Sequence, residues 1–343
     1  WAPFYANINR IMNMSYDEIY QLAGIGATVI SQNTLGTLTS MLGYSYHNGF
    51  HSGHAMITGK VLNCDLSASF DYDDRKQRCY QDGVYSCDSE TPFWKASVTV
   101  DYPLNLYNGG WQMMVIPSFS WGMNNDKFAY QGREYLMQTL TFGARFYRML
   151  PVTPSGVYPR WGFSVSAYDR VPVGDGNDYT NLTYVSGYAY FPGITRAQGL
   201  KASFMMQHHS IENRSFYYAS MASLPRGYEN TGIVPTTDYL RLSADYAVPI
   251  PSGDIAIPYV LYIKRFQLIP FADYALDINS KRKTEYFSYG GDLLMQFNVF
   301  RLRFEFTAGV RFARTLDLPT YVPDNIRNGY NRNSFSFLFG MNI

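Results

Sequence analysis

The sequence predicts an all-β fold, a transmembrane antiparallel β-barrel of about 16 strands. Three observations lead to this prediction: long segments in which apolar and polar residues alternate, a polar set that is rich in charges, and an aromatic content of 17%. Strands in soluble sandwiches are about five or six residues long, whereas a tilted strand that crosses a bilayer needs about 9 to 11. Because lipid offers no hydrogen-bond partners to an open edge, such strands have to close into a barrel.

The alternation is clearest in the two segments nearest the C-terminus. In residues 333–343, Phe335, Phe337 and Phe339 fall on one face, opposite serine, glycine and asparagine residues. In residues 301–314, apolar side chains alternate with arginine, glutamate and threonine. We expect the apolar faces to contact lipid, the charged faces to line a polar lumen, and the aromatic residues to form belts at the membrane interfaces.

The charged residues of the predicted lumen have two interpretations. They line a conducting path, or they belong to a cross-strand network in the wall, and the network is the default because a polar lumen needs charges in either case. The residues concerned are Arg241, Asp245, Arg301, Arg303, Glu305 and Arg311.

The same pattern along the chain predicts sixteen strands in a single outer-membrane barrel domain, residues 1–343. An even number of strands is typical of single-chain bacterial barrels. Short turns such as residues 33–37 alternate with long loops such as 75–92 and 211–237, which indicates periplasmic turns at one end and external loops at the other. The predicted strands are 1–9, 22–32, 36–47, 53–63, 65–73, 93–104, 111–123, 134–149, 160–171, 179–191, 199–209, 238–249, 259–276, 285–299, 301–314 and 333–343.

The composition argues against several other classes of protein. The chain has 28 basic and 27 acidic residues, so no net field directs it to nucleic acid. No phosphate-binding or dinucleotide-binding fingerprint follows a predicted strand, and no cofactor is expected. No apolar run reaches the length of about 18 residues that a transmembrane helix needs. The opening residues do not have the form of a signal peptide, so we expect that it was removed or that an upstream part is missing.

Two cysteines suggest an oxidising compartment. Cys79 and Cys87 lie in a polar stretch whose composition predicts a long loop. A local disulfide there fits an extracytoplasmic setting, and the alternative is a pair of free thiols. The third cysteine, Cys64, lies in a short predicted turn and has no assigned role.

The histidines form two groups near predicted external strand ends. They either meet around a metal ion or stand as exposed loop residues, and we expect the second, with no metal site. A histidine beside a serine, as in the sequence FHSGH at 50–54, is the minimum for a hydrolase in the barrel wall. No oxyanion-hole pattern accompanies it, so the chain is predicted not to be an enzyme. The histidines are His47, His51, His54, His208 and His209.

One polar stretch interrupts the strand pattern. Residues 224–232 read LPRGYENTG, and the PRGY within them is followed by FADYA at 271–275, in the thirteenth predicted strand. The turn 33–37 reads NTLGT, and the last strand carries Gly340. In their order and spacing these four features resemble the outer-membrane assembly and secretion barrels of the BamA, TamA and FhaC type, the bacterial surface antigen family.

The resemblance implies that the arginine-bearing stretch is the sixth extracellular loop, folded back into the lumen. It implies a contact between Arg226 and Asp273, with Gly227 and Tyr228 completing the loop signature and Phe271 belonging to the strand motif. Phe271 and Asp273 share one face by the period of two, so a lumen-facing carboxylate is coherent. In a partly desolvated lumen an arginine and an aspartate are tolerable only as a pair.

Several features depart from the family pattern. We expect no periplasmic POTRA repeats in this chain, and its opening resembles a divergent branch in which the barrel follows another periplasmic domain, such as a β-propeller. Pro225 stands where the signature has valine or isoleucine, Ala275 replaces a glycine, and Ile343 replaces a terminal aromatic residue.

For function, the resemblance implies a protein of the Gram-negative outer membrane that inserts or translocates client proteins. The first and last strands would pair weakly, and an incoming strand would add to the exposed edge of this lateral seam. The implied partners are outer-membrane lipid, client outer-membrane or secreted proteins, and a periplasmic domain or accessory lipoproteins. The alternative is a barrel for passive transport or for anchoring a partner, with the inserted loop as a plug. The seam residues are Trp1, Phe4, Phe335, Phe337 and Gly340.

Overall fold

The chain folds into β-structure throughout the part that can be described. The computed structural model describes residues 25–47, 49–74, 78–81, 84–88, 92–107, 109–125, 136–153, 155–174, 180–210, 221–228, 238–279, 282–300, 305–316, 318 and 330–342. These residues form one 16-stranded sheet and a separate two-stranded hairpin, and every pairing is antiparallel. No helix in this part of the chain is long and apolar enough to span a membrane.

Strands that follow one another in the sequence lie next to one another in the large sheet, since short turns or single loops connect them. The order is β1-β2-β3-β4-β7-β9-β10-β11-β12-β13-β14-β15-β16-β17-β18, with β8 beside β9, while β5 and β6 form the hairpin. The bounds are β1 Ile25–Gln32, β2 Leu38–His47, β3 Phe50–Val61, β4 Cys64–Asp73, β5 Arg78–Gln81, β6 Val84–Asp88, β7 Phe93–Asp101, β8 Leu104–Asn105, β9 Gln112–Asn124, β10 Met137–Met149, β11 Gly162–Val173, β12 Leu182–Pro192, β13 Gly199–His209, β14 Asp238–Ile257, β15 Leu261–Asn279, β16 Arg282–Val299, β17 Glu305–Thr315 and β18 Asn333–Asn342.

Fifteen of the sixteen predicted strands coincide with strands of the large sheet, and the predicted strand 1–9 lies outside the described residues. The largest difference is in β14, which was predicted to end at residue 249 and continues to Ile257. Pro249 and Pro251 lie at the start of this extension. Strand β13 pairs with β14 only as far as Ala247, so the prolines lie where one edge of β14 has no described partner strand, and an edge tolerates the missing N–H groups.

Alternation along β15 separates two faces of the sheet. Asp273 and Asp277 are 0% and 2% exposed, whereas Leu268 is 43% exposed. We call the face that carries Asp273 the polar face and the opposite one the apolar face. Through the strand register, the apolar face continues over the neighbouring strands with exposed Leu242, Leu293, Val310, Phe335 and Phe337.

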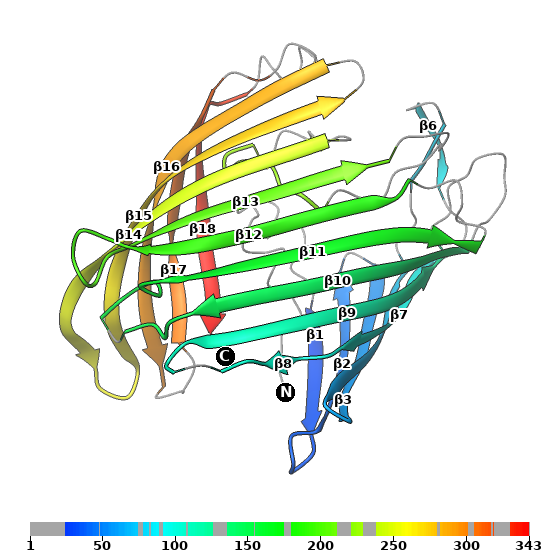
Figure 1. Cartoon of the computed structure of the whole chain (residues 1–343), viewed down its shortest axis with the longest axis horizontal. Helices are drawn as coiled ribbons and strands as arrows, with labels where there is room; N and C mark the ends of the chain where they lie inside the picture. The colour runs from blue at the N-terminus through cyan, green and yellow to red at the C-terminus, as the bar shows by residue number, and fades with distance from the viewer. Residues whose placement is uncertain are drawn as a thin grey trace.

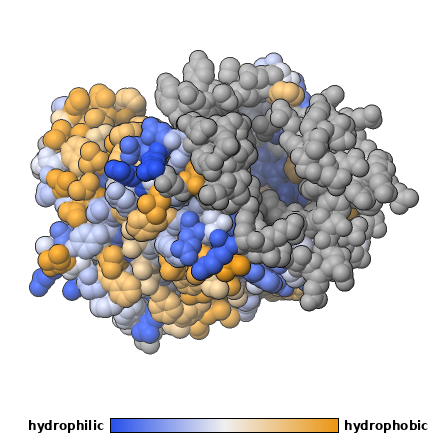
Figure 2. All heavy atoms as spheres, turned by 90° about the horizontal axis from the view of Figure 1, so that it is seen from above, coloured by the Kyte–Doolittle hydropathy of each residue, from blue (hydrophilic) through white to orange (hydrophobic). Residues whose placement is uncertain are grey.

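The buried core lies on the polar face, where an aromatic cluster of Tyr228, Tyr239 and Tyr286 packs with Ala275. The large apolar side chains of the opposite face stay uncovered, and Figure 2 shows apolar residues gathered on the left and lower sides of the view. Soluble monomers rarely expose a contiguous apolar surface of this extent. The distribution therefore matches a sheet whose outer face meets an apolar medium.

The sheet is strongly curved, and Figure 1 shows β14 to β18 turning away from the plane of β9 to β12. Strands β1 and β18 are its two ends, and among the described strands no pairing joins them. Trp1 and Phe4, which were predicted on one side of the seam, lie outside the described residues. Closure of the barrel stays a prediction.

Candidate functional site

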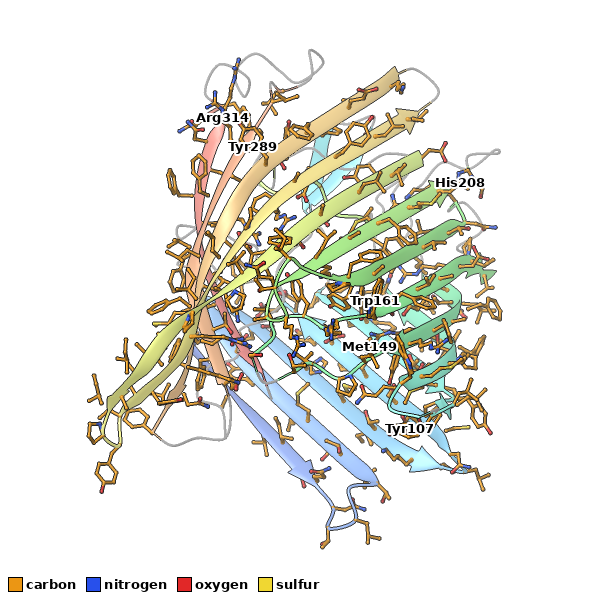
Figure 3. All side chains as sticks on the ribbon, turned by 60° about the vertical axis from the view of Figure 1, so that its left-hand side comes forward. Tyr107, Met149, Trp161, His208, Tyr289 and Arg314 are labelled. Carbon is orange, nitrogen blue, oxygen red and sulfur yellow. The ribbon has the colours of Figure 1, made fainter. Side chains whose placement is uncertain are left out.

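The candidate site is the segment 221–228, which we call the arginine loop. It belongs to the connection that leaves the sheet at the end of β13, marked by His208 in Figure 3, and returns at the start of β14. The Gln207 side chain accepts hydrogen bonds from the backbone N–H groups of Met221, at 2.8 Å, and Ala222, at 3.1 Å. These bonds hold the chain over the polar face.

Arg226 contacts Asp273 of β15 through three hydrogen bonds. Its Nε donates to Asp273 Oδ2 at 2.8 Å, its Nη2 donates to Oδ1 at 2.6 Å, and its backbone N–H donates to Oδ2 at 2.9 Å. Arg226 is 9% exposed and Asp273 is fully buried. A planar guanidinium and a carboxylate that meet edge to edge form the strongest kind of charged hydrogen bond in proteins. The structure therefore brings together the two residues that the family resemblance paired, and the role of this contact in the protein's activity stays a prediction.

Two residues of β14 extend the contact to four charged groups. Arg226 Nη2 also donates to Asp245 Oδ1 at 2.6 Å, and Arg241 Nη2 donates to Asp273 Oδ2 at 3.0 Å. Arg241 Nη1 reaches the arginine loop as well, at 2.9 Å from the Leu224 carbonyl. Sequence reasoning placed Arg241 and Asp245 on the lumen face but did not join them to Asp273. The strand register explains why these residues meet. It sets Arg241 opposite Ala275 and Asp245 opposite Phe271, so that Arg241 and Asp245 both lie diagonally across from Asp273 in the β14–β15 pair.

The four groups balance in charge, and the balance keeps Arg226 ionised. Burial alone lowers the pKa of Arg226, but the hydrogen bond and negative charge of Asp273, together with those of Asp245, raise it above the ordinary arginine value. The guanidinium therefore stays protonated and can hold the loop at any physiological pH.

Phe271 supplies an aromatic floor for the arginine. The Arg226 guanidinium carbon lies 3.7 Å from the centre of the Phe271 ring, and the ring is 5% exposed. A cation over a desolvated ring is worth about 2 kcal/mol. Phe271 and Asp273 of the FADYA motif thus meet the same guanidinium, one by its ring face and one by its carboxylate.

Gly227 and Tyr228 fit the loop against β16 and β17. Gly227 has a φ of +93°, and a Cβ atom there would lie 2.8 Å from Thr315 Cγ2, so only glycine fits. Tyr228 is 0% exposed, and its hydroxyl donates to the Phe287 and Leu316 carbonyls at 3.2 and 3.3 Å.

A further tyrosine, which sequence reasoning missed, connects the arginine loop to the last hairpin. The Tyr330 hydroxyl lies 3.3 Å from the Gly227 carbonyl and 2.6 Å from Thr315 Oγ1, and its ring stacks on that of Tyr228 with centres 6.4 Å apart. Tyr330 precedes β18 by three residues. No local pattern distinguishes it, because a tyrosine in a polar loop is common in a chain with 31 tyrosines.

Two of the departures from the family signature lie at buried positions of the site. Pro225 is fully buried, and its carbonyl accepts the Tyr228 N–H at 3.2 Å, which closes a tight turn around Arg226 and Gly227. Ala275 is 0% exposed within the tyrosine cluster. Both residues are apolar and compact, so they fit the sites at which the signature has other apolar residues.

Two more of the charges predicted on the lumen face lie in ion pairs. Arg311 forms a two-bond fork with Asp292, at 2.8 and 2.9 Å, and Glu305 pairs with Lys264. Arg301 and Arg303 lie outside the described residues. For the described charges, the cross-strand network is the interpretation that the geometry supports.

The NTLGT turn is held by its asparagine. Asn33 Oδ1 accepts the backbone N–H groups of Thr37, at 2.8 Å, and Leu38, at 3.1 Å, while Asn33 Nδ2 donates to Thr37 Oγ1 at 2.8 Å. Gly36 has a φ of +65°, which favours glycine. The motif is thus a turn that closes the β1–β2 hairpin.

Of the seam residues, the described ones lie on β18. Phe335 and Phe337 are exposed on the apolar face, and Gly340 pairs with Thr307 of β17. A Cβ atom on Gly227 would come within 3.4 Å of Ser334 Oγ, so the arginine loop also reaches the start of β18. Opening of the seam stays a prediction.

The cysteines and histidines have separate places. Cys79 and Cys87 are register partners in the β5–β6 hairpin, and their disulfide stays a prediction, whereas Cys64 is a free thiol. Four of the histidines each have a side-chain partner. His51 contacts Tyr44, His54 contacts Asp71, and His208 contacts Asp238. His209 contacts Thr180 and Gln207. Among the described residues, no group of three or more His, Cys, Asp or Glu side chains could hold a metal ion.

The comparisons with known proteins concern the fold. No protein-family model matches the sequence, and no curated protein matches it. Among solved structures, CdiB from Escherichia coli matches with a TM-score of 0.58 at 10% identity, covering 93% of this chain and 59% of that one. BamA from Haemophilus ducreyi lacking POTRA domains 1–3 matches with a TM-score of 0.54 at 12% identity, covering 94% and 68%. CdiB from Acinetobacter baumannii gives 0.51 at 11% identity, covering 92% and 56%.

These matches extend over more than nine tenths of this chain, which spans 56% to 68% of the length of the matched chains. At identities of 10% to 12% the likeness establishes the fold. The large antiparallel sheet is therefore that of the BamA and CdiB barrels.

Proposed function

We propose that this chain, whose sheet is that of the BamA and CdiB barrels, closes into an outer-membrane barrel of a Gram-negative bacterium and inserts or translocates client proteins through a lateral seam. The observation that carries the proposal is the buried contact of Arg226 with Asp273. It fastens a loop from one end of the strands to β15, three strands from β18 in the sheet order.

The arginine loop supports the wall on the side of the seam. It bonds to β14 and β15 through Arg226, to β16 and the end of β17 through Tyr228, and to the segment before β18 through Tyr330. Bonds to five consecutive strand regions would keep this part of the wall in one shape while the edge of β18 opens. The apolar face of the same strands would meet lipid.

The seam would work by strand addition. When the first and last strands separate, the edge of β18 exposes backbone N–H and C=O groups, and a client strand satisfies them by β-augmentation. In lipid, unpaired backbone groups cost several kcal/mol each, so an open edge favours an incoming strand. The client's own folding would supply the free energy.

Disulfide cross-linking of the seam tests the proposal. Cysteines are placed in pairs between residues 1–9 and β18, and the purified protein is assayed in liposomes for insertion of a small eight-stranded outer-membrane barrel as a probe client. Cross-linked protein should lose insertion and regain it with reductant. The matched control links Leu293 to Val310, which are already register partners in the β16–β17 pair away from the seam, and should insert normally. Normal insertion with a fully cross-linked seam would contradict the seam mechanism.

A second candidate function belongs to a different class. The arginine loop is buried on the polar face, as a plug would be, which also fits a barrel for passive transport of a small solute or for anchoring a partner. In that case cross-linking the seam leaves activity unchanged, and solute flux through liposomes, rather than client insertion, depends on the loop.

A further inference from the structure

A second loop lies on the polar face, and it comes from the opposite end of the strands. Residues 150–153 and 155–161, which we call the turn-side loop, belong to the connection between β10 and β11. That connection is at the end of the sheet that also carries the turns 33–37 and 193–198. Figure 3 labels the flanking Met149 and Trp161, well apart from His208, near which the arginine loop begins.

The turn-side loop contacts a strand that is distant from it in the sheet order. Arg265 Nη1 of β15 donates to the Gly156 carbonyl at 2.9 Å and to the Ser155 carbonyl at 3.3 Å. In the sheet order β12, β13 and β14 lie between β11 and β15, so the contact joins strands that are four places apart in the sheet. Arg265 Nε donates to Gln296 Oε1 of β16 at 2.6 Å, which fixes the orientation of the guanidinium. The Arg265 side chain of β15 thus holds the turn-side loop through the loop's main-chain carbonyl oxygens.

Tyr158 fills the space between the turn-side loop and the strands beneath it. Its ring centre lies 5.3 Å from that of Tyr190 on β12, and a Cβ atom on Gly199 of β13 would come within 3.2 Å of the Tyr158 Cβ. Burial, and then the charge of Asp245, raise the pKa of Tyr158, while the charge of Arg226 lowers it. Tyr158 is therefore in electrostatic range of the ion pair that holds the arginine loop.

The two loops converge on one strip of β15. Arg265 contacts the turn-side loop and Asp273 contacts the arginine loop, and between them Gln267 and Ile269 are only 3% and 7% exposed. Within the described part of the chain, Gln267 Nε2 is buried without a hydrogen-bond partner.

We propose that the turn-side loop is a second inner loop that closes the passage from the turn end, and that Arg265 is the residue that positions it. The proposal rests on the closed barrel of the proposed function. A solute or chain that moves along the polar face then meets two barriers, the arginine loop from one end and the turn-side loop from the other. Because Arg265 binds main-chain carbonyls, the closure depends on this arginine more than on the side chains of the loop.

The test compares Arg265→Ala with the wild-type protein in planar lipid bilayers. The variant should show a several-fold higher mean conductance and faster hydrogen exchange in residues 150–161. Arg265→Lys, which keeps the charge but has one nitrogen for two partners, should fall between them. The matched control is Lys264→Ala, one residue earlier in β15, whose side chain pairs with Glu305. It should leave conductance and exchange in the loop unchanged.

A second variant keeps the test decisive if Arg265→Ala does not fold. Replacement of residues 151–159 by Gly-Ser-Gly removes the barrier without touching the strand, and it should raise conductance in the same way. Conductance equal to wild type in a folded variant with a released or shortened loop overturns the proposal. Failure of the wild-type protein to insert as a heat-modifiable barrel would instead overturn the closed barrel itself, so the two failures are distinguishable.

Discussion

Arg226 Nη2 lies 2.6 Å from Asp273 Oδ1, although the two residues are 47 positions apart in the sequence. The contact is buried, and Arg241 and Asp245 bind its two halves from β14. Two arginines and two aspartates therefore form one neutral unit between the loop and the wall. This arrangement decides how the contact should be tested.

Alanine substitution of either partner should destabilise the fold strongly. Arg226→Ala leaves a buried carboxylate with a weaker partner, and Asp273→Ala leaves a buried guanidinium, so each should lower the free energy of unfolding by about 3–5 kcal/mol. The double variant should lose less than the sum, because the two residues share one interaction. Urea unfolding in detergent micelles, followed by the heat-dependent gel shift, measures all three. Asp238→Ala, which removes a partly exposed carboxylate paired with His208, is the control and should cost under about 1 kcal/mol.

Reversing the two charges should not restore stability. In the variant Arg226→Asp with Asp273→Arg, the new carboxylate would face Asp245 and the new guanidinium would face Arg241. Like charges in this buried site repel, so the reversed variant should be no more stable than the single variants. Wild-type stability in the reversed variant would show that the pair acts without its two neighbours.

Gly227→Ala should destabilise the arginine loop by more than its backbone conformation alone explains. A left-handed conformation costs a residue with a side chain about 1–2 kcal/mol, and the contact with Thr315 adds about 1–3 kcal/mol. Gly253→Ala is the matched control, because Gly253 also has a positive φ, +63°, but nothing lies within 4 Å of its Cβ position. Unfolding free energies of the two variants separate the steric contact from the backbone strain. Equal losses would contradict a tight fit of the loop against β17.

Tyr330→Phe should loosen the connection between the arginine loop and the last hairpin. The variant loses the hydroxyl that contacts the Gly227 carbonyl and Thr315 Oγ1, at a cost of about 1 kcal/mol, and keeps the ring stacked on Tyr228. Hydrogen exchange should rise in residues 221–228 and in β18 together. Tyr289→Phe, at a position 45% exposed on the apolar face, should change neither. A rise confined to one of the two segments would argue against the coupling.

Cys79 and Cys87 should form a disulfide in protein purified from an oxidising compartment. The backbone register of the β5–β6 hairpin sets these two residues opposite each other, while Cys64 is free. A maleimide reagent applied to denatured, unreduced protein should label Cys64 alone, and two further sites should be labelled after reduction. Labelling of all three cysteines without reductant would favour the alternative of free thiols.

The strands and their faces could be read from the sequence because the period of two is local. Whether Leu268 and Asp273 point in opposite directions depends only on the pleat of β15, and fifteen predicted strands coincide with observed ones for this reason. The extension of β14 past Pro249 could not be read in the same way. It depends on β13 ending its pairing at Ala247, which is a relationship between two strands.

The site was only partly predictable, because the residues that form it are far apart in the sequence. The family resemblance joined Arg226 to Asp273, but the same-face positions of Arg241 and Asp245 became partners of that pair only through the register of β14 on β15. Tyr330 and the turn-side loop had no sequence signal at all. The loop is held by its own carbonyl oxygens, and every residue carries a carbonyl.

The sequence by itself therefore determined that the chain is a sheet with an apolar and a polar face, because side-chain alternation is a property of each strand alone. Only the tertiary structure decided that two loops, from opposite ends of the strands, both contact β15. Their contacts join Arg226 to Asp273 and Gly156 to Arg265 across several strands. Such contacts depend on register and curvature, which are set by all the strands together.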